Sequence, residues 1–157
     1  MNGAREAAET VIRTTDKELR FDAVPKTLSA SSDVESRCEA QSRWVQKLKE
    51  ICQDAASHNW DGEGAEPVQD GAIKYAIALV SELTQGVRFP DAGVDPDGEI
   101  SLEWRVRGDA FSISISSEGR LSYAGLFGKS DCHGTEWMDG YVPAQVLRQL
   151  DRLVFSP

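Results

Sequence analysis

The sequence lacks several features that define whole classes of protein. It has only three cysteines among 157 residues, too few for the disulfide framework of a secreted protein. It contains no apolar run of about 18 residues, as a membrane-spanning helix requires. The charged segment 1–20 has no apolar stretch of the kind found in secretory signals. We therefore expect a cytoplasmic protein that does not engage membranes.

The sequence also lacks the short motifs of common catalytic and cofactor sites. It contains no Gly-x-Gly-x-x-Gly, no Gly-Lys-Ser/Thr phosphate loop, no Gly-x-Ser-x-Gly and no His-Glu-x-x-His. The Cys-x2-Cys spacing of zinc sites is absent as well. These absences predict no cofactor, no metal and no catalytic residue, and so a non-enzymatic protein.

Cations are scarce, and the imbalance is concentrated in one region. The net charge is −9 and the isoelectric point about 4.7, which disfavours direct binding to nucleic acid. Segment 58–99 contributes net −7, because Lys74 and Arg88 are its only basic residues. Its nine acidic residues are Asp61, Glu63, Glu66, Asp70, Glu82, Asp91, Asp95, Asp97 and Glu99. They form either a solvated surface that aids solubility or a docking surface for a basic partner.

The hydrophobic pattern predicts one α+β domain over 34–157, preceded by an N-terminal region. Segment 1–22 has a weak amphipathic pattern, and 23–33 reads as a linker with Pro25 as a breaker, so 1–33 is either flexible or binds a partner. Helices are expected over 33–57 and 69–84, the first starting with a capping box at Ser32 and Glu35. Pro143 suits the first position of a last helix.

Residues 91–127 alternate between apolar and polar, which predicts an antiparallel meander of three or four strands with helices on one face. Gly108-Asp109 is expected to form a two-residue turn. That turn pairs six apolar residues: Val106 with Phe111, Trp104 with Ile113, and Leu102 with Ile115.

The second turn is expected at residues 117–119, with Gly119 where a positive φ is needed. It pairs Ile115 with Leu121 and Ile113 with Tyr123. Both turns place the large apolar side chains on one face and leave a serine-rich face to solvent. Residues 128–142 are expected to form a loop that includes at most a short edge strand.

The loop from Trp60 to Pro67 is the most distinctive segment. In a functional interpretation, Trp60 anchors a partner and the nearby acids bind it. In a structural interpretation, which we favour, Trp60 fills the core, Asp61 bonds backbone amides, and Gly62 and Gly64 supply unusual backbone angles. The candidate partner-binding residues are Trp60, Asp61, Glu63, Glu66, Asp95, Asp97 and Glu99.

The cysteines offer little for catalysis. Cys38 and Cys52 lie on the apolar stripe of the 33–57 helix and are expected to be buried. Cys132 and His133 are adjacent, so on an extended segment their side chains point in opposite directions. A thiol-dependent hydrolase that uses Cys132 with His58 or His133 stays an alternative hypothesis, although no base-and-orienter pattern supports it.

Two segments resemble a group of small uncharacterised bacterial proteins. They are Asn59-Trp60-Asp61-Gly62-Glu63-Gly64-Ala65 with Pro67 and a helix, and Gly98-Glu99-Ile100-Ser101-Leu102-Glu103-Trp104. The resemblance covers about residues 55–125. The position between the two glycines is often aromatic in that group, whereas here it is Glu63. The resemblance implies a bacterial or phage origin and the α+β fold, and no catalytic residue.

Taken together, the sequence favours a protein-binding module of bacterial or mobile-element origin. Inhibitor, antitoxin-like and accessory roles fit a protein whose acidic 58–99 region, serine-rich sheet face or N-terminal helix binds a protein partner. The alternative is an acidic mimic of nucleic acid that inhibits a nucleic-acid-binding defence enzyme, in the manner of an anti-CRISPR protein. That hypothesis requires the acidic residues to line one face.

Overall fold

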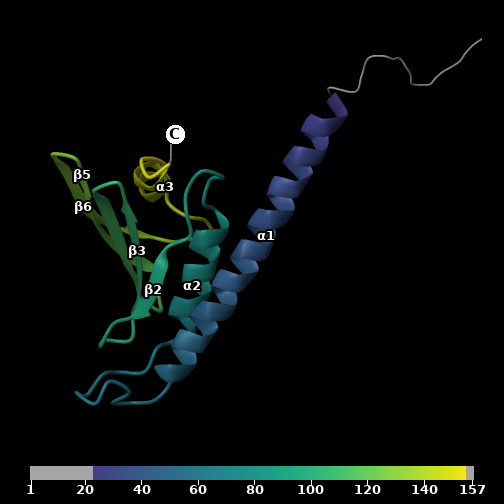
Figure 1. Ribbon diagram of the computed structural model, residues 1–157. Helices are drawn as coiled ribbons and strands as arrows, with labels where there is room; N and C mark the ends of the chain where they lie inside the picture. Colours follow the sequence, from purple (N-terminus) through teal and green to yellow (C-terminus); the bar gives the residue numbers. More distant parts are fainter. Residues whose placement is uncertain (1–22, 155–157) are drawn as a thin grey trace, which may run out of the picture. The chain divides into compact units, whose positions relative to one another are not determined.

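A computed structural model describes the backbone of residues 23–154 and the side chains of residues 33–154. The amphipathic segment expected at 1–22 lies outside the described residues. Three helices and five strands follow one another along the chain (Figure 1). They are α1 (Ala23–Asp54), α2 (Asp70–Ser81), β2 (Asp91–Val94), β3 (Ile100–Val106), β4 (Asp109–Ile115), β5 (Arg120–Phe127), β6 (Ser130–Trp137) and α3 (Ala144–Asp151).

The strands form one antiparallel sheet in the order β2-β3-β4-β5-β6, which confirms the α+β class and the meander. The sheet has five strands, where the sequence predicted three or four. No described helix has the length and apolar character of a membrane span.

One face of the sheet is buried under helices. The chain divides into two units, 1–40 and 41–157. Within the second unit, α2, α3 and the part of α1 from Gln41 onward supply the helical side of a single core. Its fully buried members alternate along the strands, as the period-two pattern predicts. On the strands these residues are Ile100, Leu102, Phe111, Ile113, Ile115 and Leu121. The helical side contributes Leu48, Leu79, Leu150 and Leu153.

The first hairpin has a different register from the predicted one: each residue of β3 pairs two positions earlier in β4, and the turn begins one residue earlier. Its turn is Arg107-Gly108, whose φ angles are 51° and 88°. Positive φ at both central residues characterises the type I′ turn, which matches the twist of the flanking strands. The observed pairs are Val106 with Asp109, Trp104 with Phe111, Leu102 with Ile113, and Ile100 with Ile115. Because side chains alternate with a period of two, this shift leaves every side chain on its predicted face.

The second hairpin has the predicted register. Ile115 lies opposite Leu121, Ile113 lies opposite Tyr123, and Gly119 adopts a φ of 91° in the three-residue turn. The outer face departs from the prediction at Ser116, which is 6% exposed. The Ser116 hydroxyl oxygen accepts hydrogen bonds from the backbone N–H groups of Glu118 and Arg120. Ser116 is thus part of the turn rather than of the solvated surface.

Two segments expected to be irregular are regular elements. Residues 130–137, predicted as part of a loop, form β6, which pairs with β5 along its whole length. Residues 23–33, predicted as a linker, belong to α1, so the capping box at Ser32 and Glu35 does not start a helix. Pro25 lies near the start of the described part of α1. Pro143 precedes α3 as its N-cap residue.

The inner face of the sheet makes a prediction about stability. Ile113→Ala removes a side chain that is fully buried and is expected to lower the free energy of unfolding by about 2–5 kcal/mol. The neighbouring Ser112→Ala, on the outer face, is the matched control and is expected to change it by less than about 0.5 kcal/mol. Urea denaturation of both variants measures the difference, and equal losses would contradict the assignment of the two faces.

Candidate functional site: two joined acidic loops

The loop between α1 and α2 is folded around two side chains. The Asp61 Oδ1 accepts hydrogen bonds from the N–H groups of Glu63 (2.8 Å) and Ala65 (3.1 Å). The Asn59 Oδ1 accepts one from the N–H of Gly64 (2.6 Å). These bonds replace the solvation of three amides in a tight turn. The structural interpretation of Asp61 is therefore confirmed.

The same loop uses residues that tolerate positive φ. The φ angles are 63° at Asn59, 81° at Gly62 and 95° at Gly64. A Cβ at Gly62 or Gly64 would meet nothing within 4 Å, so these positions need glycine for its backbone freedom and not for space. The predicted role of both glycines is thus confirmed.

Trp60 does not fill the core as predicted. Its side chain is half-buried and lies outside the set of core residues. The indole N–H donates to the Glu66 carbonyl at 2.9 Å, so Trp60 closes the loop on itself. The prediction failed because a tryptophan at a loop start has two uses, core filling and loop closure, which the sequence pattern does not separate.

The carboxyl group of Asp61 has a lowered pKa. The causes are the hydrogen bonds that it accepts from the Glu63 and Ala65 amides, which stabilise the ionised form. Asp61 is thus held as a carboxylate by the backbone of its own loop.

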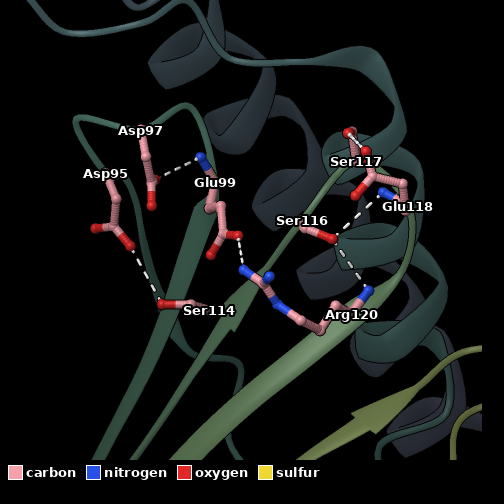
Figure 2. A network of polar contacts seen from close by, with 8 residues as sticks. All are labelled: Asp95, Asp97, Glu99, Ser114, Ser116, Ser117, Glu118 and Arg120. Carbon is pink, nitrogen blue, oxygen red and sulfur yellow. Dashed lines mark hydrogen bonds and ion pairs between the residues drawn. The ribbon is translucent and has the colours of Figure 1, made fainter.

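The turn between β2 and β3 repeats this construction. The Asp95 N–H donates to the Glu99 carbonyl, and the Gly98 N–H donates to the Asp95 carbonyl. The Asp97 Oδ1 accepts a hydrogen bond from the Glu99 N–H at 3.1 Å (Figure 2). Gly98 has a φ of 87°, as the turn requires.

The two loops touch each other through their backbones. The Glu66 N–H donates to the Pro96 carbonyl at 2.8 Å. A Cβ at Gly98 would lie 2.7 Å from the Pro67 carbonyl oxygen, so only glycine permits this approach. We call residues 58–67 and 95–99 together the acidic loop pair. It contains all of the predicted partner-binding residues, Trp60, Asp61, Glu63, Glu66, Asp95, Asp97 and Glu99, and the contact between its two loops runs through residues 66–67 and 96–98.

The acidic loop pair contains one strong ion pair. The Arg120 guanidinium, on β5, donates to the Glu99 carboxylate, and the Ser114 hydroxyl donates to Asp95 at 3.2 Å (Figure 2). Burial raises the pKa of Glu99, and the negative charges of Asp97 and Asp95 raise it further, whereas Arg120 opposes them. Like charges are therefore crowded at this turn even with Arg120 present.

The remaining acids of segment 58–99 lie on other elements. Asp70 starts α2, Glu82 follows its end, and Asp91 begins β2, opposite Glu103 on β3. A helix of this length separates its ends by about 16 Å. Six of the nine acids thus gather on the acidic loop pair.

The structure does not assemble the thiol site. Cys132 is half-buried beside the core and His133 is exposed, as their alternation on β6 predicts. His58 lies 3.9 Å from the Glu66 carboxylate. Among residues 33–154, no hydrogen bond joins Cys132 to either histidine. Cys52 is buried as predicted, but Cys38 is exposed, since it lies on α1 before Trp44, the first buried residue of that helix.

A shallow hollow on the outer sheet face was not anticipated. It has a volume of about 340 Å³, and small residues, among them Ala110, Ser112, Ala124 and Gly125, form part of its lining. Small side chains repeated at alternate positions of neighbouring strands are the sequence signal that indicates such a hollow. Among the described residues, no group of three His, Cys, Asp or Glu side chains is arranged to hold a metal ion.

Comparisons with protein-family models, curated proteins and solved structures find no match for this chain.

The contact between the loops predicts unequal effects of two glycine substitutions. Gly62→Ala introduces only backbone strain and is expected to cost about 1 kcal/mol. Gly98→Ala adds a collision with the Pro67 carbonyl and is expected to cost about 2 kcal/mol or more. Urea denaturation measures both, and hydrogen exchange at the Glu66 amide should accelerate in the Gly98 variant alone. Equal costs with unchanged exchange would contradict the close approach.

The crowding of carboxylates predicts a stabilising substitution. The pKa of Glu99 is raised in the folded state. Ionised Glu99 therefore lowers the free energy of unfolding at neutral pH, and this loss disappears as the pH falls through the folded-state pKa and Glu99 is protonated. Asp97→Asn removes one cause and keeps the oxygen that accepts from the Glu99 N–H. We expect the free energy of unfolding to rise by about 0.5 kcal/mol at pH 7, and the gain to vanish near pH 3.

The control for this substitution is Asp139→Asn, at an exposed position with the same change of net charge. It is expected to have a smaller effect at pH 7. If the two variants show the same gain at every pH, the repulsion is a property of the whole acidic chain and not of this turn.

Proposed function

We propose that this protein is a non-enzymatic binding module that recognises a basic protein partner through the acidic loop pair. The observation that carries the proposal is the Glu66–Pro96 backbone hydrogen bond together with the close approach at Gly98. This contact joins two acidic loops from distant parts of the sequence, and the two loops together carry six carboxylates. Inhibitor, antitoxin-like and accessory roles in a bacterium or mobile element all fit this chemistry.

The internal hydrogen bonds support recognition of this kind. Association costs free energy when loops become ordered, and a loop that is already hydrogen-bonded avoids much of that cost. Both loops fix their backbones with their own Asn and Asp side chains. Exposed carboxylates in fixed positions speed encounter with a basic surface and select against acidic partners. Half-buried Trp60 lies in the same loop and offers apolar surface next to the charges.

The electrostatics favour a permanently negative surface. Backbone hydrogen bonds from Glu63 and Ala65 lower the pKa of Asp61, so its charge persists to a lower pH than that of an ordinary aspartate. Arg120 offsets the charge of Glu99, while Glu63, Glu66 and Asp97 are exposed. Exposed carboxylates of the acidic loop pair, such as those of Glu63 and Asp97, are thus accessible to a basic partner.

A nucleic-acid mimic is the second candidate, and the concentration of acid in segment 58–99 favours it. Its requirement is stricter, because an array of phosphates is extended and regular. Asp70 and Glu82 lie at opposite ends of α2, so the nine acids do not form one continuous array. The protein-binding module needs only the acidic loop pair, and we therefore prefer it.

The proposal is tested with two triple variants of equal net charge. Glu63→Gln, Glu66→Gln and Asp97→Asn neutralise exposed positions of the acidic loop pair. Asp54→Asn, Glu82→Gln and Asp139→Asn neutralise exposed positions elsewhere. Each protein is immobilised and exposed to a bacterial lysate, and the affinity of each retained protein is then measured in purified form. We expect the first triple to weaken binding by about tenfold, and the second by much less.

Equal effects of the two triples, or retention of nothing beyond a blank support, would contradict the proposal. The mimic is recognised in the same experiment, since duplex DNA or RNA would then displace the retained protein. Binding by a basic partner is also expected to weaken with rising salt concentration.

A further inference from the structure

The strand β6 forms one edge of the sheet. Its eight residues pair with β5 on one side only, whereas β2, at the opposite edge, has four residues. Natural proteins protect long edges with prolines, bulges or short strands, because an open edge is a template for another strand. β6 contains no proline, and its register with β5 runs without interruption from Ser130 to Trp137.

The hydrogen bonds identify which backbone groups face the open edge. Trp137 lies opposite Arg120, and the Met138 N–H donates to the Gly119 carbonyl at 2.9 Å. Hydrogen-bonded and non-hydrogen-bonded pairs alternate along an antiparallel ladder. The even-numbered residues of β6 therefore bond to β5, while the odd-numbered residues point their N–H and C=O groups away from it. These residues are Asp131, His133, Thr135 and Trp137.

The side chains of these same four residues are exposed. Trp137 is 58% exposed, an unusual amount for a tryptophan. Lys129, also exposed, precedes the other end of the strand. Among residues 23–154, no backbone or side-chain group bonds to the open side of these odd-numbered residues. The strand thus presents free hydrogen-bonding groups, an aromatic ring at one end and a cation at the other.

We propose that β6 pairs antiparallel with β6 of a second copy of this chain, about a two-fold axis at His133, giving a continuous ten-stranded sheet. In this register three pairs of residues exchange two hydrogen bonds each: Asp131 with Thr135, His133 with His133, and Thr135 with Asp131.

The side chains favour this occupant and this register. In this register Trp137 of each copy lies beside the Gly128-Lys129 turn of the other, within reach of the long Lys129 side chain, and a cation and an aromatic face attract. Asp131 lies opposite the uncharged Thr135, and Cys132 lies opposite Gly134, which has no side chain to clash. A register centred on Asp131 would place two carboxylates opposite each other, which is destabilising. The strand is thus complementary to itself, whereas a foreign strand would need a matching sequence.

The test measures the oligomeric state by sedimentation equilibrium over a range of protein concentrations at physiological salt, with two variants of His133. His133→Pro removes an N–H that points to the open edge and is not used within the chain, so the fold is expected to tolerate it. His133→Ala keeps that N–H. We expect dimers for the wild type and for His133→Ala, and at least a tenfold larger dissociation constant for His133→Pro at unchanged thermal unfolding.

A second pair of variants keeps the test decisive if the proline variant does not fold. Thr135→Asp places a carboxylate opposite Asp131 of the partner copy and is expected to abolish the dimer. Thr135→Lys places a cation there and is expected to strengthen it. A wild type that stays monomeric at all concentrations, or identical dimerisation of the two Thr135 variants, overturns the proposal. Binding of a foreign strand by a monomeric protein would overturn it as well.

Discussion

The fold depends on the alternation of apolar and polar side chains along β3, β4 and β5. Apolar side chains at every second residue give the meander one face that must leave water, and burial of that face supplies the main free energy of folding. The two tight turns hold this alternation in phase, since Arg107-Gly108 and Gly119 adopt the positive φ angles that the turns need. The helices, the edges and the loops take their positions from this buried face.

This alternation is also the part of the structure that the sequence predicted best. It indicated the fold class, the inner face and the register of the second hairpin. The first turn was predicted one residue too late, which shifts its strand pairing by two, because Arg107 at positive φ is an unusual choice that a glycine-based rule overlooks. β6 was taken for a loop because its glycine, acids and single cysteine hide the strand pattern, and only pairing with β5 makes it regular.

The candidate site was predicted in its members but not in its assembly. Local chemistry was enough to assign Asp61, Gly62 and Gly64 to a tight loop. The contact between residues 58–67 and 95–99 joins segments about thirty residues apart, and no local pattern encodes it. Trp60 was wrongly predicted to fill the core, because a tryptophan can also close a loop. Cys38 was wrongly predicted to be buried, because an apolar stripe along a helix does not show at which residue the helix begins to pack against the core.

In the loop from Asn59 to Ala65, the groups that fold the backbone are different from the exposed side chain of Glu63. Glu63 contributes its N–H to Asp61, whereas the described contacts make no use of its carboxylate. A different side chain at this position would leave every loop hydrogen bond in place. Under the proposed function, variation at residue 63 changes the contact that the loop offers to a partner, from acidic to aromatic or basic, with little effect on the fold. One position of this loop is thus free to vary without disturbing the hydrogen bonds that fold it.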